Sequence, residues 1–118
     1  MVRSYRDLLV WQKAMELVAE VYRVVKKLPR EEQYALSDQM RRAAVSIPSI
    51  IAEGQARNST KEFIRFLSMA KGSLAELETQ CFICITLSYI SEKDLQAALS
   101  LSDELGKMLT ALIQKLSH

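Results

Sequence analysis

Apolar residues recur at alternating steps of three and four along four stretches of the chain. A repeat close to 3.5 residues keeps one stripe of a helix against its neighbours, as packing at a small crossing angle requires. The pattern therefore predicts four amphipathic helices packed side by side. The expected inward positions are Val10, Ala14, Leu17, Val21, Val24 and Leu28; Leu36, Met40, Ala43, Ile47, Ile50 and Gly54; Phe63, Leu67, Ala70, Leu74, Leu77, Cys81 and Cys84; and Leu95, Ala98 or Leu99, Ser102, Leu105, Leu109, Leu112 and Leu116.

Residues between these stretches mark where the helices begin and end. Pro29 closes the first, and Glu31 with Glu32 suits the start of the second, where the helix dipole favours anions. Ser59 and Ser91 each stand three residues before an acid, the spacing of a capping box. Because the connections are short, consecutive helices should be antiparallel. We expect an all-α, up-down-up-down antiparallel four-helix bundle with helices over roughly 7–28, 31–57, 60–89 and 92–116 in a single domain of residues 1–118.

Composition agrees with a helical globular protein. The chain has 118 residues, of which 49% are hydrophobic and 25% charged, and only 3 Gly and 2 Pro are available for turns. There is no basic-then-apolar leader and no run of 18 apolar residues, so we expect a cytoplasmic protein with no membrane partner. The formal charge is only +2, but 13 of the 16 Lys and Arg lie in residues 1–72 with 8 of the 14 acids. This asymmetry indicates either a basic face for an anionic partner or an ordinary uneven surface.

The basic residues fall into clusters, including one from Arg23 to Arg30 at the end of the first helix. Basic stripes bind phosphates in a salt-dependent way. Two structural alternatives stay open, since cations are favourable at a helix C-terminus and Glu53 with Arg57 has ion-pair spacing. Aromatic residues are not evidently interleaved, so a sequence-specific single-strand reader is not expected. The predicted nucleic-acid-binding residues are Arg23, Lys26, Lys27, Arg41, Arg42, Arg57, Lys61, Arg65 and Lys71.

Two breaks in the pattern indicate self-association. Residues 81–87 are apolar around the whole helix except for one threonine, whereas a helix of a lone bundle keeps a polar outer face. Pro48 interrupts the second helix at a cost of roughly 3 kcal/mol or a bend, and is either a tolerated kink or a shape needed for assembly. The hydroxyls of Ser46 and Ser49 are expected to satisfy the backbone group that Pro48 frees. The predicted interface residues are Phe82, Ile85, Tyr89, Pro48 and Glu53.

Signals for catalysis or metal binding are weak. Cys81 and Cys84 form a CxxC inside a predicted helix, and His118 is the only histidine, so packed core thiols are favoured over a zinc or redox site. Glycine-rich phosphate loops and the Glu-x-x-His pairs of di-iron bundles are absent. We expect no enzyme, no metal, no cofactor and no small-molecule substrate.

One block of the second helix carries a family resemblance. It reads Gln39-x-Arg41-Arg42-Ala43-Ala44-x-Ser46-Ile47-Pro48-Ser49-x-Ile51-Ala52-Glu53-Gly54-x-x-Arg57. With Leu9-x-Trp11-Gln12-x-Ala14 and Gly72-Ser73-x-x-Glu76-x-Glu78-Thr79, it resembles the small bacterial four-helix bundle proteins encoded in intervening sequences of 23S ribosomal RNA genes. The similarity covers roughly residues 5–115. The family commonly has Asn where this chain has Ile50.

The resemblance implies an up-and-down bundle that forms a ring-like homopentamer. A related protein, the accessory variability protein of diversity-generating retroelements, binds nucleic acid and a reverse transcriptase through a positively charged surface. The hypothesis is therefore a non-enzymatic homo-oligomer that binds RNA or DNA, and the alternative is a protein-binding scaffold or accessory subunit without a nucleic-acid role. Five shared charges are either a binding site or, as we prefer, a structural ion-pair network inside or between subunits: Arg41, Arg42, Glu53, Glu76 and Glu78.

Overall fold

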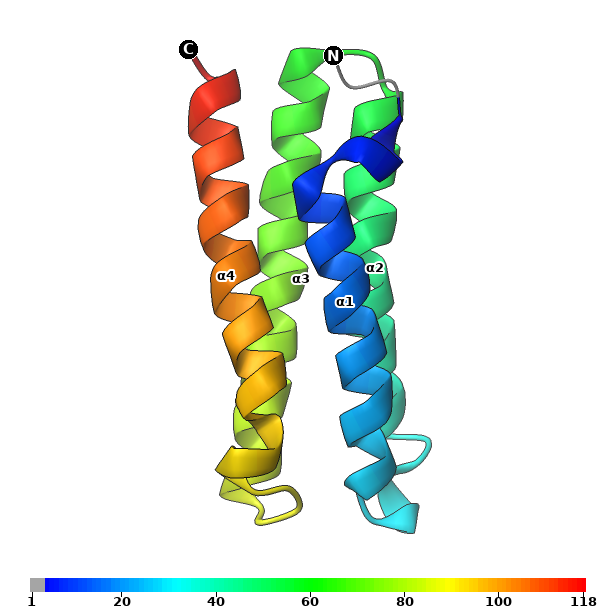
Figure 1. Cartoon of the computed structure of the whole chain (residues 1–118). Coiled ribbons are helices and arrows are strands. Elements are labelled where there is room, and N and C mark those ends of the chain that lie inside the picture. The colour runs from blue at the N-terminus through cyan, green and yellow to red at the C-terminus, as the bar shows by residue number, and fades with distance from the viewer. Residues whose placement is uncertain (1–3) are drawn as a thin grey trace.

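Four helices run alternately down and up the long axis of the molecule (Figure 1). They are α1 (Leu9–Val24), α2 (Leu36–Ala56), α3 (Thr60–Thr86) and α4 (Glu92–Leu116). The computed structural model describes residues 4–118. Within that range each helix packs against the next and α4 packs against α1, while the backbones of the diagonal pairs do not approach closely. The predicted all-α, up-down-up-down antiparallel bundle is confirmed. No helix in the described range combines the length and the hydropathy that a membrane span requires.

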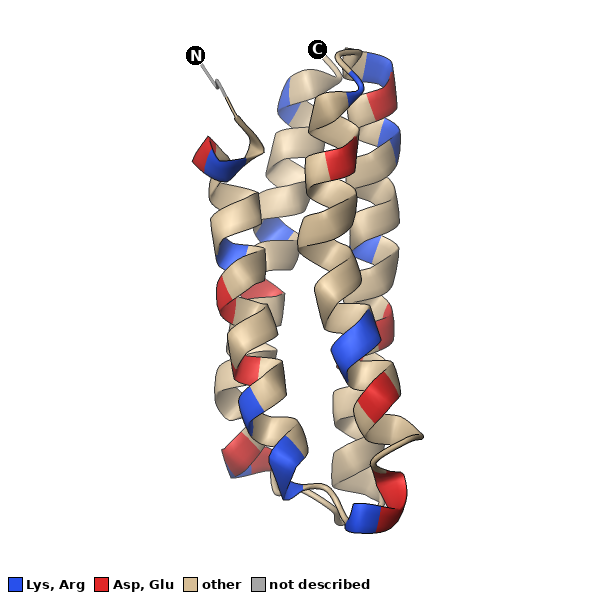
Figure 2. Ribbon diagram, turned by 90° about the vertical axis from the view of Figure 1, so that its right-hand side faces the viewer, with Lys and Arg blue, Asp and Glu red and all other residues tan. Residues whose placement is uncertain are grey.

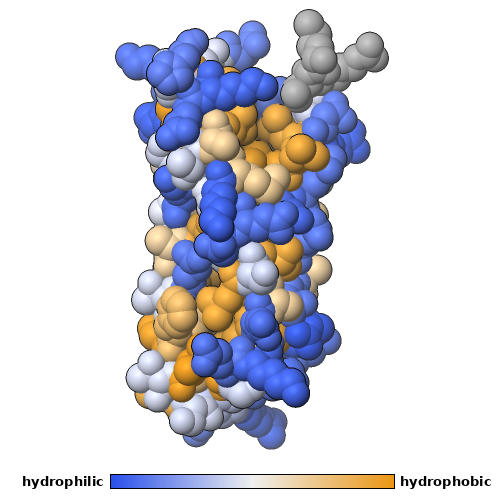
Figure 3. All heavy atoms as spheres, turned by 60° about the vertical axis from the view of Figure 1, so that its left-hand side comes forward, coloured by the Kyte–Doolittle hydropathy of each residue, from blue (hydrophilic) through white to orange (hydrophobic). Residues whose placement is uncertain are grey.

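The core is the stripe that the spacing predicts, with one shift on α2. Nearly all expected inward residues of α1 and α3 are buried, whereas Ile50 of α2 is only partly buried and Ile51 is fully buried. The contact of α2 with α3 is the most extensive of the helix pairs in the described range, which agrees with the wide buried stripe of α2. At the upper end of α4, Met108 and Leu112 are only partly buried, and Figure 3 shows hydrophobic residues exposed on this side. They lack full cover because α1 begins below the top of α4 (Figure 1).

The α1–α2 connection differs from the expected boundaries. Short 3-10 helices at Val25–Lys27 and Arg30–Glu32 lie between the two helices, so α1 ends at Val24 and α2 begins at Leu36 rather than near 31. Glu32 explains the later start. Its carboxylate accepts a hydrogen bond from the Leu36 backbone N–H at 3.3 Å, which caps α2 from four residues upstream. It also accepts from the Tyr89 hydroxyl at 3.0 Å, and this bond ties the two lower loops together.

The remaining helix ends follow the capping chemistry of the sequence. The hydroxyls of Ser59 and Ser91 accept from the backbone N–H three residues later, at 3.3 and 3.1 Å. α3 ends at Thr86 rather than 89, because Ser88 adopts a φ of 60° and Tyr89 donates its N–H to the Cys84 carbonyl at 2.9 Å. This is a Schellman motif, which satisfies the last carbonyls of the helix.

Pro48 lies inside a continuous α2 and is buried. The flanking hydroxyls do not reach the carbonyl of Ala44, the group that the missing N–H leaves free. Ser46 donates to the Ala43 carbonyl at 2.7 Å and Ser49 donates to the Val45 carbonyl at 2.9 Å. The expectation that they satisfy the freed group is therefore wrong by one residue on each side, because a serine hydroxyl bonds the carbonyl three or four positions before its own residue.

Candidate nucleic-acid interface

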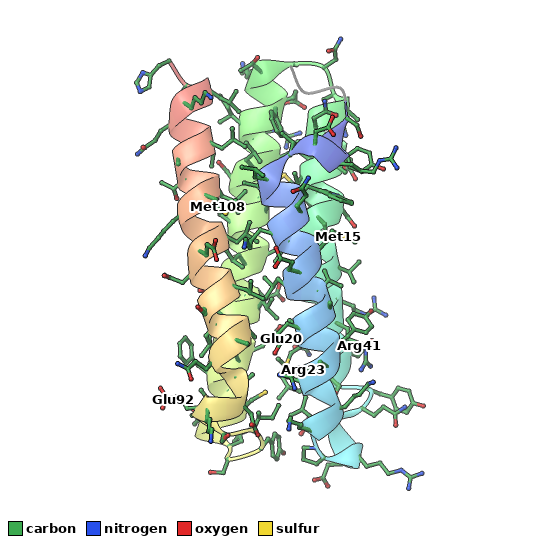
Figure 4. All side chains as sticks on the ribbon, viewed as in Figure 1. Met15, Glu20, Arg23, Arg41, Glu92 and Met108 are labelled. Atoms are coloured by element: carbon green, nitrogen blue, oxygen red, sulfur yellow. The ribbon has the colours of Figure 1, made fainter. Side chains whose placement is uncertain are left out.

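A groove at the lower end of the bundle, where α1 ends and α2 begins, is lined by three cations. We call it the basic groove. It has a volume of about 440 Å³, and its lining residues are Tyr22, Val25, Lys26, Leu28, Pro29, Arg30, Gln33, Ser37 and Arg41. No carboxylate lines it. Figure 4 shows Arg41 on the α2 side of α1, whereas Arg23 and Glu20 lie on the side of α1 that faces α4.

The local sequence places these side chains together in a simple way. Tyr22 and Lys26 are four residues apart, as are Ser37 and Arg41, and residues at that spacing share a helix face. One pair forms the α1 wall of the groove and the other forms the α2 wall. The connection between them is held short by the extended residue before Pro29 and by the 3-10 turn at Arg30–Glu32. The turn at residues 28–30, which joins the two walls, therefore lies at the end of the groove.

Two acids near the basic groove are engaged by partners outside it. Asp38 accepts from Arg42 at 3.0 Å, and Glu32 is engaged by Tyr89 and by the α2 N-terminus. The guanidinium of Arg41 donates to the Gln33 carbonyl at 3.2 Å, a contact that holds it in place without neutralising its charge. Lys26, Arg30 and Arg41 have no ion pair within 4.0 Å among residues 4–118, although Glu31 is exposed beside Arg30. The groove thus keeps most of its positive potential.

Most of the other predicted cations are ion-paired at the surface. On α2 the charges lie near the two ends, and residues 43–52 between them carry none (Figure 2). Exposed pairs of this kind contribute little to stability, but they lower the positive potential that a phosphate would meet. The pairs are Arg23–Glu20, Lys27–Asp94, Arg42–Asp38, Arg57–Glu53 and Arg65–Glu62.

Three of the predicted cations gather at the opposite, upper end of the bundle. The guanidinium groups of Arg57 and Arg65 lie 5.0 and 4.9 Å from the centre of the Phe66 ring. Lys61 is exposed beside them in the first turn of α3. The buried ring packs on Gly54, the residue that lets α2 and α3 approach closely. This cluster is a cation–π and ion-pair arrangement that stabilises the hairpin tip.

Lys71 lies apart from both clusters, in a groove between α3 and α4 that also contains Glu78, Asp103 and Lys107. Partial burial and the nearby Asp103 raise the pKa of the Glu78 carboxyl. The groove carries both signs of charge, so it does not extend the basic surface. Within one chain the five shared charges do not form a single network, because Arg42 pairs with Asp38 and Glu53 pairs with Arg57. A network between subunits stays a prediction.

With this geometry in hand, comparison with known proteins assigns the chain to a family. Residues 6–111 match the family model described as 23S rRNA-intervening sequence protein. The chain belongs to this family. It is also similar, at 26% identity and a TM-score of 0.81, to a Bacteroides thetaiotaomicron protein of unknown function from the S23 ribosomal protein family, over 89% of this chain and 98% of that one. The comparison with curated proteins gives no match.

In this family member the predicted interface residues lie at two places, with Phe82, Ile85 and Tyr89 at and just after the end of α3 and with Pro48 and Glu53 on α2, and their role in self-association stays a prediction. Phe82 is 56% exposed. Ile85 and Tyr89 are more covered, because both pack partly against the core of the chain. Glu53 is exposed and paired with Arg57. Pro48 contributes instead to a second surface, which we call the apolar groove. It lies between α1 and α2, has a volume of about 360 Å³ and is lined by Tyr5, Trp11, Met15, Val18, Val45, Pro48, Ser49 and Ala52.

The two cysteines are packed core residues. Cys81 and Cys84 are fully buried and unpaired, and the Cys84 thiol donates to the Met40 sulfur at 3.6 Å. Burial raises the pKa of the Cys81 thiol to about 12 and that of Cys84 to about 11. Both thiols are therefore protonated at neutral pH, the form that is a poor nucleophile and a poor metal ligand.

The sequence predicts most of these cations, but it does not predict which of them are paired with acids and which line the basic groove. Lys26 and Arg41 were predicted, and Arg30 was recognised only as part of a cluster. Tyr22 was not considered, although its spacing of four residues from Lys26 was visible. Which cations are neutralised depends on partners in other turns and other helices, as for Lys27 and Asp94, and spacing within one helix does not predict such pairs.

Proposed function

We propose that this chain is a non-enzymatic, self-associating protein that binds nucleic acid through the basic groove. The observation that carries the proposal is the convergence of three unpaired cations on one groove without a lining carboxylate. Phosphate contacts of this kind supply most of the affinity of sequence-independent binding. The description of the family, 23S rRNA-intervening sequence protein, makes RNA the first ligand to test.

The state of the cysteines and the histidine favours a binding role over catalysis by a thiol or an imidazole. The two thiols are buried with raised pKa values, and His118 is exposed at the end of the chain. A general base or an activated nucleophile needs a neighbour that shifts its pKa toward the working pH. Free buried thiols also suit a reducing compartment, and we place the protein in the cytoplasm on that basis.

Self-association is supported by the apolar groove. Its rim carries Met15 and Val45, each more than 40% exposed, on a face of α1 and α2 that residues 4–118 leave partly uncovered. A contact between unlike faces of successive copies closes into a ring when the rotation allows, and the resemblance described above implies five copies. A ring would repeat the basic groove around its circumference, which raises the affinity for a long polyanion through multivalency.

Binding of a labelled RNA at two salt concentrations tests the nucleic-acid role. We expect binding at 50 mM KCl in fluorescence anisotropy. Three phosphate contacts should make the affinity fall roughly 20-fold between 50 and 200 mM KCl, and more if several subunits engage one RNA. Absence of binding at 50 mM KCl would overturn the proposal in favour of the alternative, a protein-binding scaffold with no nucleic-acid role.

Replacing one methionine at the rim of the apolar groove tests self-association. Met15→Glu places a charge on the groove and should lower the assembly mass measured by multi-angle light scattering, because a buried unpaired charge opposes the contact. The matched control is Met69→Glu on α3, since both methionines are 43% exposed. An unchanged mass for Met15→Glu, or an equal decrease for both variants, would exclude the apolar groove as the interface.

A further inference from the structure

We propose that the basic groove selects single-stranded RNA, with phosphates on Lys26, Arg30 and Arg41 and an unpaired base stacked on the Tyr22 ring. The inference rests on the proposed function and adds the class of ligand. In the linear sequence no aromatic residue is evidently interleaved with the cations, which argues against a sequence-specific single-strand reader. The fold changes this, since Tyr22 and the three cations line the same groove.

The exposure of Tyr22 is not explained by the fold of the chain. Its side chain is 43% exposed, and within residues 4–118 it makes no hydrogen bond and no ring contact. By comparison, Tyr89 donates to Glu32, and Tyr5 packs edge-on against Trp11 with ring centroids 5.4 Å apart. Tyr22 therefore places a partly exposed aromatic ring within a positively charged groove. That combination of a cationic track and a stacking platform is typical of single-strand binding sites.

The rest of the lining suits a nucleotide with its base turned in. Val25, Leu28 and Pro29 give the groove apolar surface beside the ring, while Gln33 and Ser37 supply hydrogen-bonding groups. The volume of about 440 Å³ lies within the roughly 300–1,000 Å³ range of small-ligand sites. The groove therefore has the size to admit one nucleotide rather than a segment of duplex.

Duplex and single strand differ in what they offer to this site. A duplex presents its phosphates to the three cations, but its base faces are stacked on one another and do not reach Tyr22. A single strand can place its phosphates on the cations and an unstacked base on the Tyr22 ring. Stacking on an aromatic residue contributes about 1–3 kcal/mol per base, which corresponds to an affinity ratio of about 5- to 150-fold.

The test compares Tyr22→Ala with Tyr22→Phe and with the control Tyr34→Ala. Tyr34 is 88% exposed in the connection between α1 and α2 and does not line the groove. The probes are a labelled 12-nucleotide RNA without self-complementarity and its blunt duplex, measured by fluorescence anisotropy at 100 mM KCl. We expect Tyr22→Ala to weaken binding of the single strand about 5- to 150-fold and of the duplex less than twofold. Tyr22→Phe and Tyr34→Ala should bind like the wild type.

The outcomes separate this inference from the proposed function. If the wild type binds neither RNA, the proposed function fails and the inference fails with it. If the wild type binds both RNAs and Tyr22→Ala changes neither affinity, or lowers both equally, the basic groove stays a nucleic-acid site and the stacking role is wrong. Circular dichroism and light scattering on the same samples should give wild-type helix content and mass for Tyr22→Ala. A lower helix content or mass with equal loss of both affinities would assign Tyr22 to the fold or the assembly and overturn the inference.

Discussion

Replacing Lys26, Arg30 and Arg41 together by Gln should weaken RNA binding about 100-fold at 100 mM KCl. Each phosphate contact with a single strand contributes roughly 0.7 to the slope of log affinity on log salt, so three contacts at 0.1 M account for about two orders of magnitude. The bundle should stay folded. Lys26 and Arg30 are exposed and have no ion pair among the described residues 4–118, and the loss of the Arg41–Gln33 hydrogen bond costs about 1 kcal/mol. Fluorescence anisotropy gives the affinity, and circular dichroism checks the helix content.

The chain offers a control with the same loss of formal charge. Arg23, Lys27 and Arg42 lie in the same lower half of the bundle, but each is paired with an acid of its own helix or of α4. Replacing these three by Gln should change the affinity by less than about threefold, because their charges are already compensated locally. If both triple variants lose affinity equally, the RNA senses the net charge of the protein and the basic groove is not the site.

Gly54→Ala should lower the free energy of unfolding by about 2 kcal/mol, with loss of the close contact between α2 and α3. A Cβ at this position would overlap the Cβ of Phe66 and lie 3.1 Å from its Cγ and 3.4 Å from Cδ1 of Phe63. The obstructing atoms include the root of a buried side chain rather than a flexible end. The helices must therefore separate, and overpacking of this kind typically costs 1–3 kcal/mol, occasionally more. Urea unfolding at a fixed protein concentration measures the change.

Gly72→Ala is the matched control, and it should change the free energy of unfolding in the opposite direction. Gly72 lies in α3, and a Cβ there would meet no atom within 4 Å. Alanine is favoured over glycine in a helix interior by about 1 kcal/mol, so this variant should be slightly more stable than the wild type. Stabilisation by both substitutions would show that α2 and α3 accommodate the extra methyl group, and the account of Gly54 would be wrong.

The fold was predictable because its determinants are local and repeated. Each predicted helix has its apolar stripe, and Ser59 and Ser91 cap α3 and α4 as their spacing indicates. The start of α2 was missed, since Glu32 caps it from four residues away while bonded to Tyr89, a residue 57 positions later. No pattern within one helix reveals a partner at that distance.

For the candidate site, the sequence predicts that basic residues are involved but not where they come together. The sequence identified basic clusters, but five of the nine predicted cations are paired with acids, and two groups lie at opposite ends of the bundle. The groove depends on the turn around Pro29, which brings the end of α1 beside the start of α2. The aromatic residue of the groove was missed because Tyr22 belongs to a different helix from Arg41. Its place beside that cation follows from the packing of α1 on α2.

The salt dependence of RNA binding by the wild type and the Lys26/Arg30/Arg41 triple variant tests the central claim most directly. The measured quantity is the slope of log affinity against log potassium concentration for the 12-nucleotide single strand. The slope for the wild type should be steeper than that of the triple variant by about 2, one step of roughly 0.7 for each cation removed. Equal slopes would contradict the account, because they would mean that the RNA releases its counterions somewhere other than the basic groove.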